Sequence, residues 1–443
     1  MLRDDVRQLA AEHGRGPTVA AIRAALAELR ALPDPGVLGP LTAADWVVRR
    51  ATAGVARAPR RLRRVVNGTG VVIHTNLGRA PLGVAAARRA AELAAGYSNL
   101  ELDLVSGRRG DRQDLLSELL CSLSGAEGAL VVNNGAAAVL LGLAALCRGH
   151  EVVVSRGEAI EIGGGFRIPD ILRLSGARIR EVGTTNRTRP SDYEDACGPR
   201  TAAWLRVHQS NFRMEGFVER PSVRELARAA HQRRLLLLED VGSGLIPAAE
   251  VATQPEDRLL ASVKAGVDLL FCSGDKLVGA SQAGIICGRA DLVARLRRHP
   301  LARALRPDKL QLAALEETLL CYQSPDRLRE IPVWRMLHQD DAALEARARR
   351  WAAVLARAGV AAEVVGLKGA VGGGTTPGHP LDSHGLLIPA RNPAALRRRL
   401  LAGDPPILTL EQDRGVAIDA RCVLPDEQSG MLRALVAALG STR

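Results

Sequence analysis

Short apolar runs alternate with helix-length stretches through the middle of the chain. The runs cover residues 130–132, 152–154, 202–207, 235–238 and 269–271. Their length and mostly apolar composition are typical of strands that are buried on both faces. The stretches between them, such as 222–234, have the pattern of helices. This alternation predicts a mostly parallel sheet with helices on both faces, in which functional residues gather just past the carboxyl ends of the strands.

The N-terminal part of the chain has a purely helical pattern. Its apolar residues recur at helical spacing, at Val19, Ile22, Leu26 and Leu29. The sequence Pro-Asp-Pro-Gly at 33–36 ends that helix, and a second helix is predicted to begin near Thr42, which can cap it. We therefore expect a helical domain over residues 1–64.

After about residue 315 the pattern changes again. The predicted elements are helices at 338–358 and 393–402, strands at 360–365, 385–389 and 416–420, and a glycine-rich loop at 369–378. Helices that alternate with strands in this way predict a small α/β domain. We therefore expect a large α/β domain over 65–315 and a small one over 316–443.

The composition is ordinary for a soluble chain of 443 residues, with 47% hydrophobic and 24% charged residues. Aromatic residues make up only 2%, so the core must consist mainly of Ala, Leu and Val. No apolar run is long enough to span a membrane and no hydrophobic signal segment begins the sequence, so we expect a cytoplasmic protein. Seven cysteines are scattered without CxxC spacing, which predicts neither a disulfide framework nor a metal site.

The net charge of +12 and the sequence pI of about 10.1 indicate an anionic partner. Nucleic acid is the natural candidate. The densest basic cluster follows the predicted helices and consists of Arg57, Arg60, Arg61, Arg63 and Arg64. A second run of arginines occupies 397–399. An arginine-rich composition also produces solvated basic faces, so charge supports an RNA partner without establishing one.

Lysine is rare in this arginine-rich chain. The 60 Lys and Arg residues include four lysines: Lys264, Lys276, Lys309 and Lys368. Lys276 follows the apolar run at 269–271 and a turn of small residues, where an amine can be desolvated and positioned. A Schiff base with an aldehyde cofactor requires lysine and cannot use arginine. The alternative is an ordinary loop lysine.

An acidic pair ends the predicted strand at 235–238. If the strand continues through Glu239 and Asp240, their side chains point to opposite faces and only one of them can serve a site. An aspartate at this place can pair with a protonated pyridine nitrogen and so keep the ring an electron sink. The alternatives are a strand end that reaches the surface and a magnesium ligand.

A turn of small residues after the strand at 130–132 opens a helix at Asn134, Gly135 and Ala136. Exposed N–H groups at a helix start bind phosphate, although tight packing is the commoner reason for such a turn. Ser273 lies three positions before Lys276 and can also donate to a phosphate. Phosphate cradle, strand-end aspartate and Ser-x-x-Lys follow one another as in pyridoxal 5′-phosphate (PLP) enzymes of the aspartate aminotransferase type. Together they predict a PLP site.

These residues lie within longer blocks that resemble one family. The blocks are at 67–70, 74–81, 97–101, 155–158, 161–164, 183–188, 207–212 and 274–276. Through them the chain is similar to the bacterial selenocysteine synthases, the L-seryl-tRNA(Sec) selenium transferases, most specifically from about 60 to 310. The resemblance implies a fold-type I PLP enzyme that converts L-seryl-tRNA(Sec) to L-selenocysteinyl-tRNA(Sec) through an aminoacrylyl-tRNA intermediate, with selenophosphate as the selenium donor.

The resemblance also implies residue roles. Lys276 holds the cofactor and removes the α-proton of the seryl group, and Asp240 keeps the pyridine ring protonated. The remaining cofactor-binding residues would be Asn134, Gly135, Ala136, Ser210, Asn211 and Ser273. The selenium donor would be bound by Arg79, Arg303 and Arg306. Because Arg303 and Arg306 are three positions apart, we expect them on one face of a helix.

Recognition of the tRNA would fall mainly to the N-terminal helices and the arginine cluster at 57–64, with an affinity that decreases as salt increases. The family further implies a homo-oligomer, a homodecameric ring, with the block at 183–188 near subunit contacts. Two other functions stay open from the residues alone. A related PLP-dependent lyase acting on a small amino sugar or amino acid would have no use for a basic helical domain. A non-catalytic RNA-binding scaffold would have no reason to retain a buried amine.

Overall fold

The computed structural model describes residues 3–30, 40–56, 61–162, 166–209, 212, 214–244, 259–373 and 380–440. The chain divides into two compact units, Met1–Arg64 and Val65–Arg443. Within the part of the chain that is described, no helix is both long and apolar enough to cross a membrane.

The N-terminal unit consists of helices. Its elements are α1 (Asp4–His13), α2 (Arg15–Arg30) and α3 (Pro40–Ala56). A small core holds them together and contains Leu9, Ala25, Val47, Ala51 and Val55. Helix α2 confirms the helix predicted from the apolar spacing, and α3 confirms the second helix. The predicted break at 33–36 lies outside the described residues.

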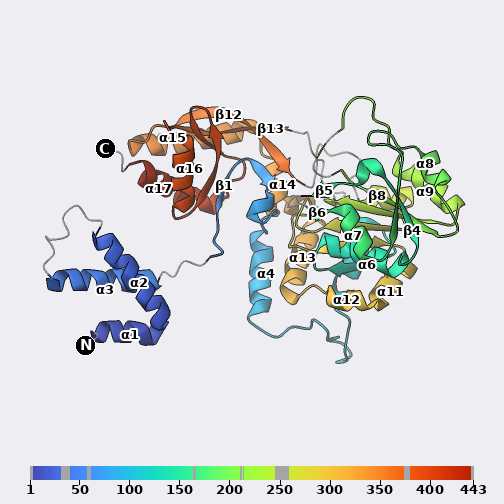
Figure 1. Ribbon diagram of the computed structural model, residues 1–443, viewed down its shortest axis with the longest axis horizontal. Helices are drawn as coiled ribbons and strands as arrows, with labels where there is room; N and C mark the ends of the chain where they lie inside the picture. The colour runs from blue at the N-terminus through green and yellow to red at the C-terminus, as the bar shows by residue number, and fades with distance from the viewer. Residues whose placement is uncertain are drawn as a thin grey trace. The chain divides into compact units, whose positions relative to one another are not determined.

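A seven-stranded sheet organises the first part of the second unit (Figure 1). Its strands are β3 (Gly128–Val132), β4 (Glu151–Ser155), β7 (Arg178–Val182), β8 (Thr201–Val207), β9 (Leu236–Gly242), β10 (Leu269–Ser273) and β11 (Gly284–Gly288). They lie in the order β3-β11-β10-β9-β8-β4-β7. Strand β11 runs antiparallel to both of its neighbours, and the other pairs are parallel. The prediction of a mostly parallel sheet is therefore confirmed.

Helices cover both faces of this sheet because alternate residues of each strand point to opposite faces. Leu270 and Trp204 belong to one hydrophobic core, whereas Phe271 and Leu205, their neighbours in sequence, belong to another. The helices of this part are α4 (Val84–Ala94), α5 (Asp114–Ser124), α6 (Gly135–Leu146), α7 (Ile168–Leu174), α8 (Pro190–Asp195), α9 (Val223–Gln232), α10 (Leu259–Ala265), α11 (Ala290–Arg298), α12 (Pro300–Ala304), α13 (Lys309–Cys321) and α14 (Pro332–Leu337). Helix α9 confirms the helix predicted at 222–234.

A second, six-stranded sheet lies in the C-terminal part of the unit. Its strands are β1 (Val66–Gly68), β2 (Val71–Ile73), β12 (Glu363–Gly372), β13 (Pro380–Pro389), β14 (Ile407–Gln412) and β15 (Gly415–Asp419). Three helices belong to the same part, namely α15 (Asp341–Arg357), α16 (Pro393–Ala402) and α17 (Gln428–Leu439). Its core contains Trp351, Leu386 and Ile418.

Two features of this sheet differ from the pattern in the sequence. Strand β12 continues to Gly372, so the loop predicted from residue 369 is wrong for its first four residues, and 374–379 lie outside the described residues. Strands β1 and β2 pair with β14 and β12, so a segment from the start of the predicted large domain completes the C-terminal sheet. The domain limits at 315 and 316 stay a prediction.

Candidate active site

Lys276 lies just past the carboxyl end of β10, in the turn that leads to β11. All five residues of β10 are buried, and the lysine side chain at its end is also buried, with the residue 7% exposed. The Lys276 carbonyl accepts a hydrogen bond from the Gly279 amide at 2.9 Å, which closes the turn. Burial lowers the pKa of the Lys276 amine below its ordinary value. The interpretation of Lys276 as a desolvated lysine, rather than an ordinary loop lysine, agrees with this environment.

Asp240 lies near the carboxyl end of the neighbouring strand, β9. It is the register partner of Phe271 in β10, and β9 continues past it to Gly242. Glu239, on the opposite face, is buried and lies 3.6 Å from Arg206 (Oε1 to Nε). The two acidic side chains thus point to opposite faces, as the alternation predicts. Only Asp240 remains on the side of Lys276.

The charges of Asp240 and Lys276 influence each other. Burial is the largest effect on the Asp240 carboxyl and raises its pKa, and the nearby Lys276 ammonium opposes that rise. In the same way the Asp240 carboxylate opposes the lowering of the Lys276 pKa. The Gly242 amide donates to Asp240 Oδ1 at 2.9 Å and holds the carboxyl in place. An amine and a carboxyl therefore lie close enough to influence each other's charge, at the carboxyl ends of two neighbouring strands.

A third group, the start of helix α6, lies against the end of β10. Asn134 caps this helix, since its Oδ1 accepts a hydrogen bond from the Ala137 amide at 2.9 Å. A Cβ added to Gly135 would overlap the Ser273 hydroxyl. The absence of a side chain at Gly135 therefore lets Ser273 approach the first turn of α6. The amides of Gly135 and Ala136 belong to that turn, where helix N–H groups have no carbonyl partner within the helix.

Arg79 reaches the same place from a distant part of the sequence. It follows the short helix Thr75–Leu77 in a tight turn and adopts a positive φ of 65°, which is rare for a residue other than glycine. Its Nη1 lies 2.9 Å from Oδ2 of Asp275, the residue before Lys276. The Asp275 carboxyl is buried, and the Ala80 amide donates to its backbone carbonyl at 3.2 Å. Asp275 is a site residue that sequence reasoning missed, although it belongs to the Gly-Asp-Lys block.

The other two predicted anion-binding arginines have different surroundings. Helix α12 ends at Ala304, so Arg306 lies beyond it and the expected common helical face with Arg303 is wrong. Arg306 Nη1 lies 3.2 Å from Glu101 Oε1, and Arg303 is exposed. The Leu305 carbonyl accepts a hydrogen bond from the Asn133 amide at 2.9 Å. This bond brings the segment of Arg306 next to the start of α6.

The segment after β8 contributes further groups. The His208 amide donates to the Asp240 carbonyl at 2.9 Å, and positive charge on the imidazole would lower the pKa of the Asp240 carboxyl. The next residue, Gln209, donates from Nε2 to the Gly157 carbonyl at 2.8 Å. Ser210 and Asn211, the other predicted cofactor ligands, lie outside the described residues.

An ion pair with a buried carboxylate holds the end of β8 in place. The buried Glu158 carboxylate accepts hydrogen bonds from the Val207 amide at 2.9 Å and from Arg220 Nη2 at 2.8 Å. Glu158 and Arg220 thus attach the end of β8 to the end of β4. Sequence reasoning did not single out either residue, because one buried carboxylate among many acidic residues carries no pattern of its own.

The predicted RNA-binding cluster is described in part. Arg61, Arg63 and Arg64 are exposed. Arg57 and Arg60 lie outside the described residues. The exposed arginines carry positive charge at the end of the helical unit, where it is accessible to an anionic partner.

The grouping fits PLP. A buried lysine can bond to the aldehyde of PLP, and an aspartate on the adjacent strand can pair with its pyridine nitrogen. A helix start with a serine hydroxyl can bind its phosphate. The overlap that a Cβ at Gly135 would cause shows that the helix start and Ser273 form one cradle. The lysine and the aspartate belong to the carboxyl ends of the adjacent strands β10 and β9, and the helix start follows β3, which β11 separates from β10.

Comparison with known proteins identifies the family. Residues 65–424 match the family model of L-seryl-tRNA selenium transferase. An L-seryl-tRNA(Sec) selenium transferase of Geobacter sulfurreducens is 45% identical over 443 residues, covering 98% of this chain and 96% of the relative. The corresponding protein of Hyphomonas neptunium is 43% identical over 430 residues, covering 95% of this chain and 93% of the relative.

Among solved structures, D-glucosaminate-6-phosphate ammonia-lyase is similar with a TM-score of 0.62 and 20% identity, over 86% of this chain and 97% of that one. This similarity concerns the fold and, together with the parallel sheet, confirms the predicted fold class. The sequence relatives extend across nearly the whole chain, including the basic helical unit. The chain belongs to the L-seryl-tRNA selenium transferase family.

Proposed function

We propose that this protein converts L-seryl-tRNA(Sec) to L-selenocysteinyl-tRNA(Sec), with PLP as its cofactor and selenophosphate as the selenium donor. The observation that carries the proposal is the buried Lys276 amine, whose charge interacts with that of Asp240, in a chain that matches a named selenium transferase over 98% of its length. Neither group would be retained at this cost in desolvation by a protein without a use for it.

Lys276 is the base for the seryl α-carbon. Because burial lowers its pKa, a larger share of the amine is neutral near pH 7 and can accept a proton. When bound, PLP supplies an electron sink for the negative charge that the proton leaves behind. The Asp240 carboxylate would accept a hydrogen bond from the protonated pyridine nitrogen and hold that proton on the ring. Ser273, Gly135 and Ala136 would bind the phosphate.

Arg79 is the anchor for the selenium donor. Its guanidinium is paired with Asp275 beside Lys276, and the forked N–H groups of arginine match the oxygens of a phosphate-like anion. Arg303 and Arg306 would add positive charge from the segment that bonds to Asn133. A serine esterified to tRNA has no free carboxylate for an arginine to bind. These arginines are therefore available to bind the selenium donor.

The N-terminal unit and the arginines at 57–64 would bind the tRNA through its phosphates. A reaction on charged tRNA belongs in the bacterial cytoplasm. The homodecameric ring implied by the family resemblance is the assembly that we propose.

A lyase for a small amino sugar or amino acid is the second candidate function. The similarity to D-glucosaminate-6-phosphate ammonia-lyase concerns the fold. At 20% sequence identity it does not indicate that the two proteins share a substrate. The basic helical unit, shared with the selenium transferases, favours the tRNA substrate.

The deciding experiment incubates the PLP-loaded protein with Ser-tRNA(Sec), with Ser-tRNA(Ser) and with free serine. We expect the absorption of the cofactor to change with Ser-tRNA(Sec) alone, and selenium from radiolabelled selenophosphate to enter the aminoacyl group. Lys276→Ala should abolish the absorption of the covalently held cofactor, and Lys264→Ala is the matched control. If free serine changes the cofactor spectrum as much as Ser-tRNA(Sec) does, and no selenium is transferred to tRNA, the protein is the lyase instead.

A further inference from the structure

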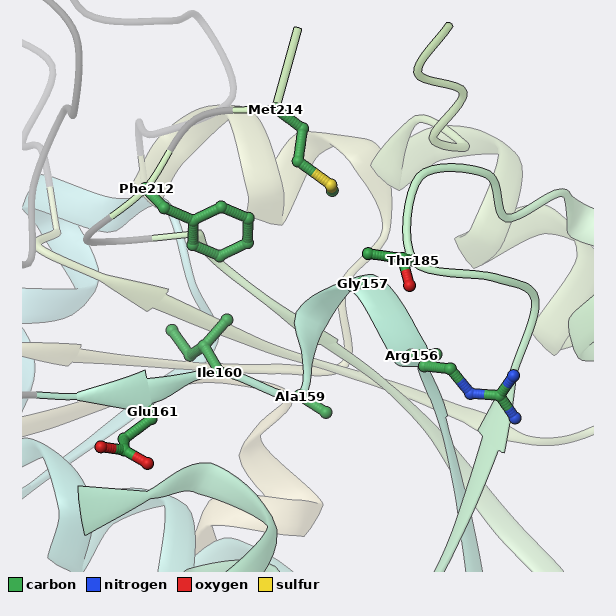
Figure 2. A pocket seen from close by; sticks show the side chains of 8 residues that line it. All are labelled: Arg156, Gly157, Ala159, Ile160, Glu161, Thr185, Phe212 and Met214. Atoms are coloured by element: carbon green, nitrogen blue, oxygen red, sulfur yellow. The ribbon is translucent and has the colours of Figure 1, made fainter. Parts of the chain in front are cut away.

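A pocket of about 320 Å³ lies at the carboxyl edge of the seven-stranded sheet (Figure 2). Its lining comes from three loops. The segment after β4 contributes Arg156, Gly157, Ala159, Ile160 and Glu161, the loop after β7 contributes Thr185, and the loop after β8 contributes Phe212 and Met214. None of these residues has a role in the cofactor site described above.

The lining combines apolar and polar groups. Phe212 and Ile160 lie on one side of the pocket, and Thr185 and Arg156 lie on the other (Figure 2). Gly157 forms part of the wall, because a Cβ there would collide with the Thr185 carbonyl. A flat aromatic ring, opposed by a hydroxyl and a guanidinium, is the surface on which proteins stack an unpaired base and hold its sugar and phosphate.

Charge in the pocket is compatible with an anionic ligand. Glu161, the acidic residue of the lining, is paired with Arg167 at 2.9 Å (Oε2 to Nε). Arg156 lies 3.6 Å from Glu181 (Nε to Oε2), and both side chains are partly exposed, so the pairing is weak and the guanidinium keeps access to solvent. The pocket therefore presents one cation, Arg156, and one carboxylate, Glu161, each held in an exposed ion pair.

The pocket is joined to the catalytic groups by short hydrogen bonds. Gln209 donates to the Gly157 carbonyl in its wall, and the preceding His208 amide donates to the Asp240 carbonyl. In the sheet, β4 is three strands from β10, so the pocket lies roughly 14 Å across the strands from Lys276 at the usual strand spacing. About six covalent bonds, on the order of 8 Å, separate the α-carbon of an esterified serine from the first atom of the adjoining base. Together with the width of the base, this length spans most of that distance.

We propose that this pocket binds the 3′-terminal adenosine of the charged tRNA, with the base stacked on Phe212 and the adjoining phosphate near Arg156. The inference rests on the proposed function, since it needs serine attached to a nucleoside. The inference gives the carboxyl edge of the sheet a second function, which is to bind the nucleoside. The cofactor groups on β9 and β10 act on the serine, and the loops after β4, β7 and β8 hold the nucleoside that carries it.

The test uses the full-length, PLP-loaded protein and a stable analogue, 2-aminopurine riboside with L-serine joined to the 3′ position by an amide. Stacking of 2-aminopurine on an aromatic ring quenches its fluorescence, so the signal reports the base and not the reaction. We expect quenching with the parent protein and with Phe212→Tyr. Phe212→Ala should lose the quenching and bind about tenfold more weakly, as expected when one base–aromatic stack is removed.

Phe217→Ala is the matched control. Phe217 follows on the same segment, is exposed, and packs against Arg187 outside the pocket. Its removal should leave both quenching and affinity unchanged. L-serine amide, which lacks the nucleoside, should bind the parent and Phe212→Ala equally.

Two outcomes would overturn the inference. One is equal affinity of Phe212→Ala and the parent for the analogue. The other is a rise in the KM for selenophosphate in Phe212→Ala with the KM for Ser-tRNA(Sec) unchanged, which would assign the pocket to the donor. In either case selenium transfer by the parent protein would still stand, so failure of the pocket and failure of the proposed function are distinguishable.

Discussion

Arg79 Nη1 lies 2.9 Å from Asp275 Oδ2, although 196 positions separate the two residues in the chain. The contact joins the turn after β2 to the turn that carries Lys276. It fixes a guanidinium beside the reactive amine, where its positive charge helps to lower the pKa of Lys276. Asp275 thus acts as a positioning residue for Arg79.

Asp275→Asn should weaken use of the selenium donor because it removes the charge that holds Arg79. We expect the KM for selenophosphate to rise about tenfold, as when a partly buried ion pair loses one partner. The KM for Ser-tRNA(Sec) should change little. Steady-state kinetics with each substrate varied in turn would show this. An equal rise in both KM values would indicate a general distortion of the turn instead.

The pH dependence of stability should reveal the carboxyl of Asp240. Its pKa is raised in the folded state, so the folded protein binds a proton more tightly than the unfolded chain does. Ionisation therefore costs stability above the folded-state pKa, and this cost disappears as the pH falls through that pKa towards the ordinary value of 3.8. In the cofactor-free protein, Asp240→Asn should be more stable than the parent at pH 8, with a smaller advantage at lower pH. Urea unfolding across this range measures the difference, and a constant difference would contradict the assignment.

Gly135→Ala should impair cofactor binding because the added methyl group collides with the Ser273 hydroxyl. We expect a loss of PLP affinity of tenfold or more, measured by equilibrium dialysis. The same collision should lower the free energy of unfolding. Ser273→Gly in the Gly135→Ala background should relieve the collision and recover part of that free energy. Gly198→Ala is the control, since a Cβ at that position meets nothing within 4 Å. Unchanged PLP affinity in Gly135→Ala would place the phosphate elsewhere.

The salt dependence of tRNA binding should change with the arginines that follow the helical unit. Arg61→Gln with Arg63→Gln removes two exposed charges, so the affinity should fall and the plot of log affinity against log salt should become less steep. Arg398→Gln with Arg399→Gln removes the same charge from the exposed side of α16. That pair should leave the slope unchanged. Equal effects of the two pairs would indicate non-specific attraction by net charge.

Much of the fold could be predicted from local pattern. Four consecutive leucines before Glu239 and Asp240, and the run before Ser273, are too apolar for anything but buried strands, and they became β9 and β10. Parallel order followed from the helices between them. The pairing of β1 and β2 with strands some 300 positions later could not be predicted, because the partners of a short strand are chosen by packing and not by its own sequence.

The sequence by itself determined the chemical groups of the candidate site. A rare lysine after a buried strand, a strand-end aspartate and a small-residue helix start are local features, and each can be read from its neighbours. Tertiary structure alone decided how they combine. It placed Asp275 against Arg79, ended α12 before Arg306, and formed a pocket that Phe212 and the loops after three strands line. The physical reason is that ion pairs and pockets depend on distances between segments remote in sequence, which no local periodicity encodes.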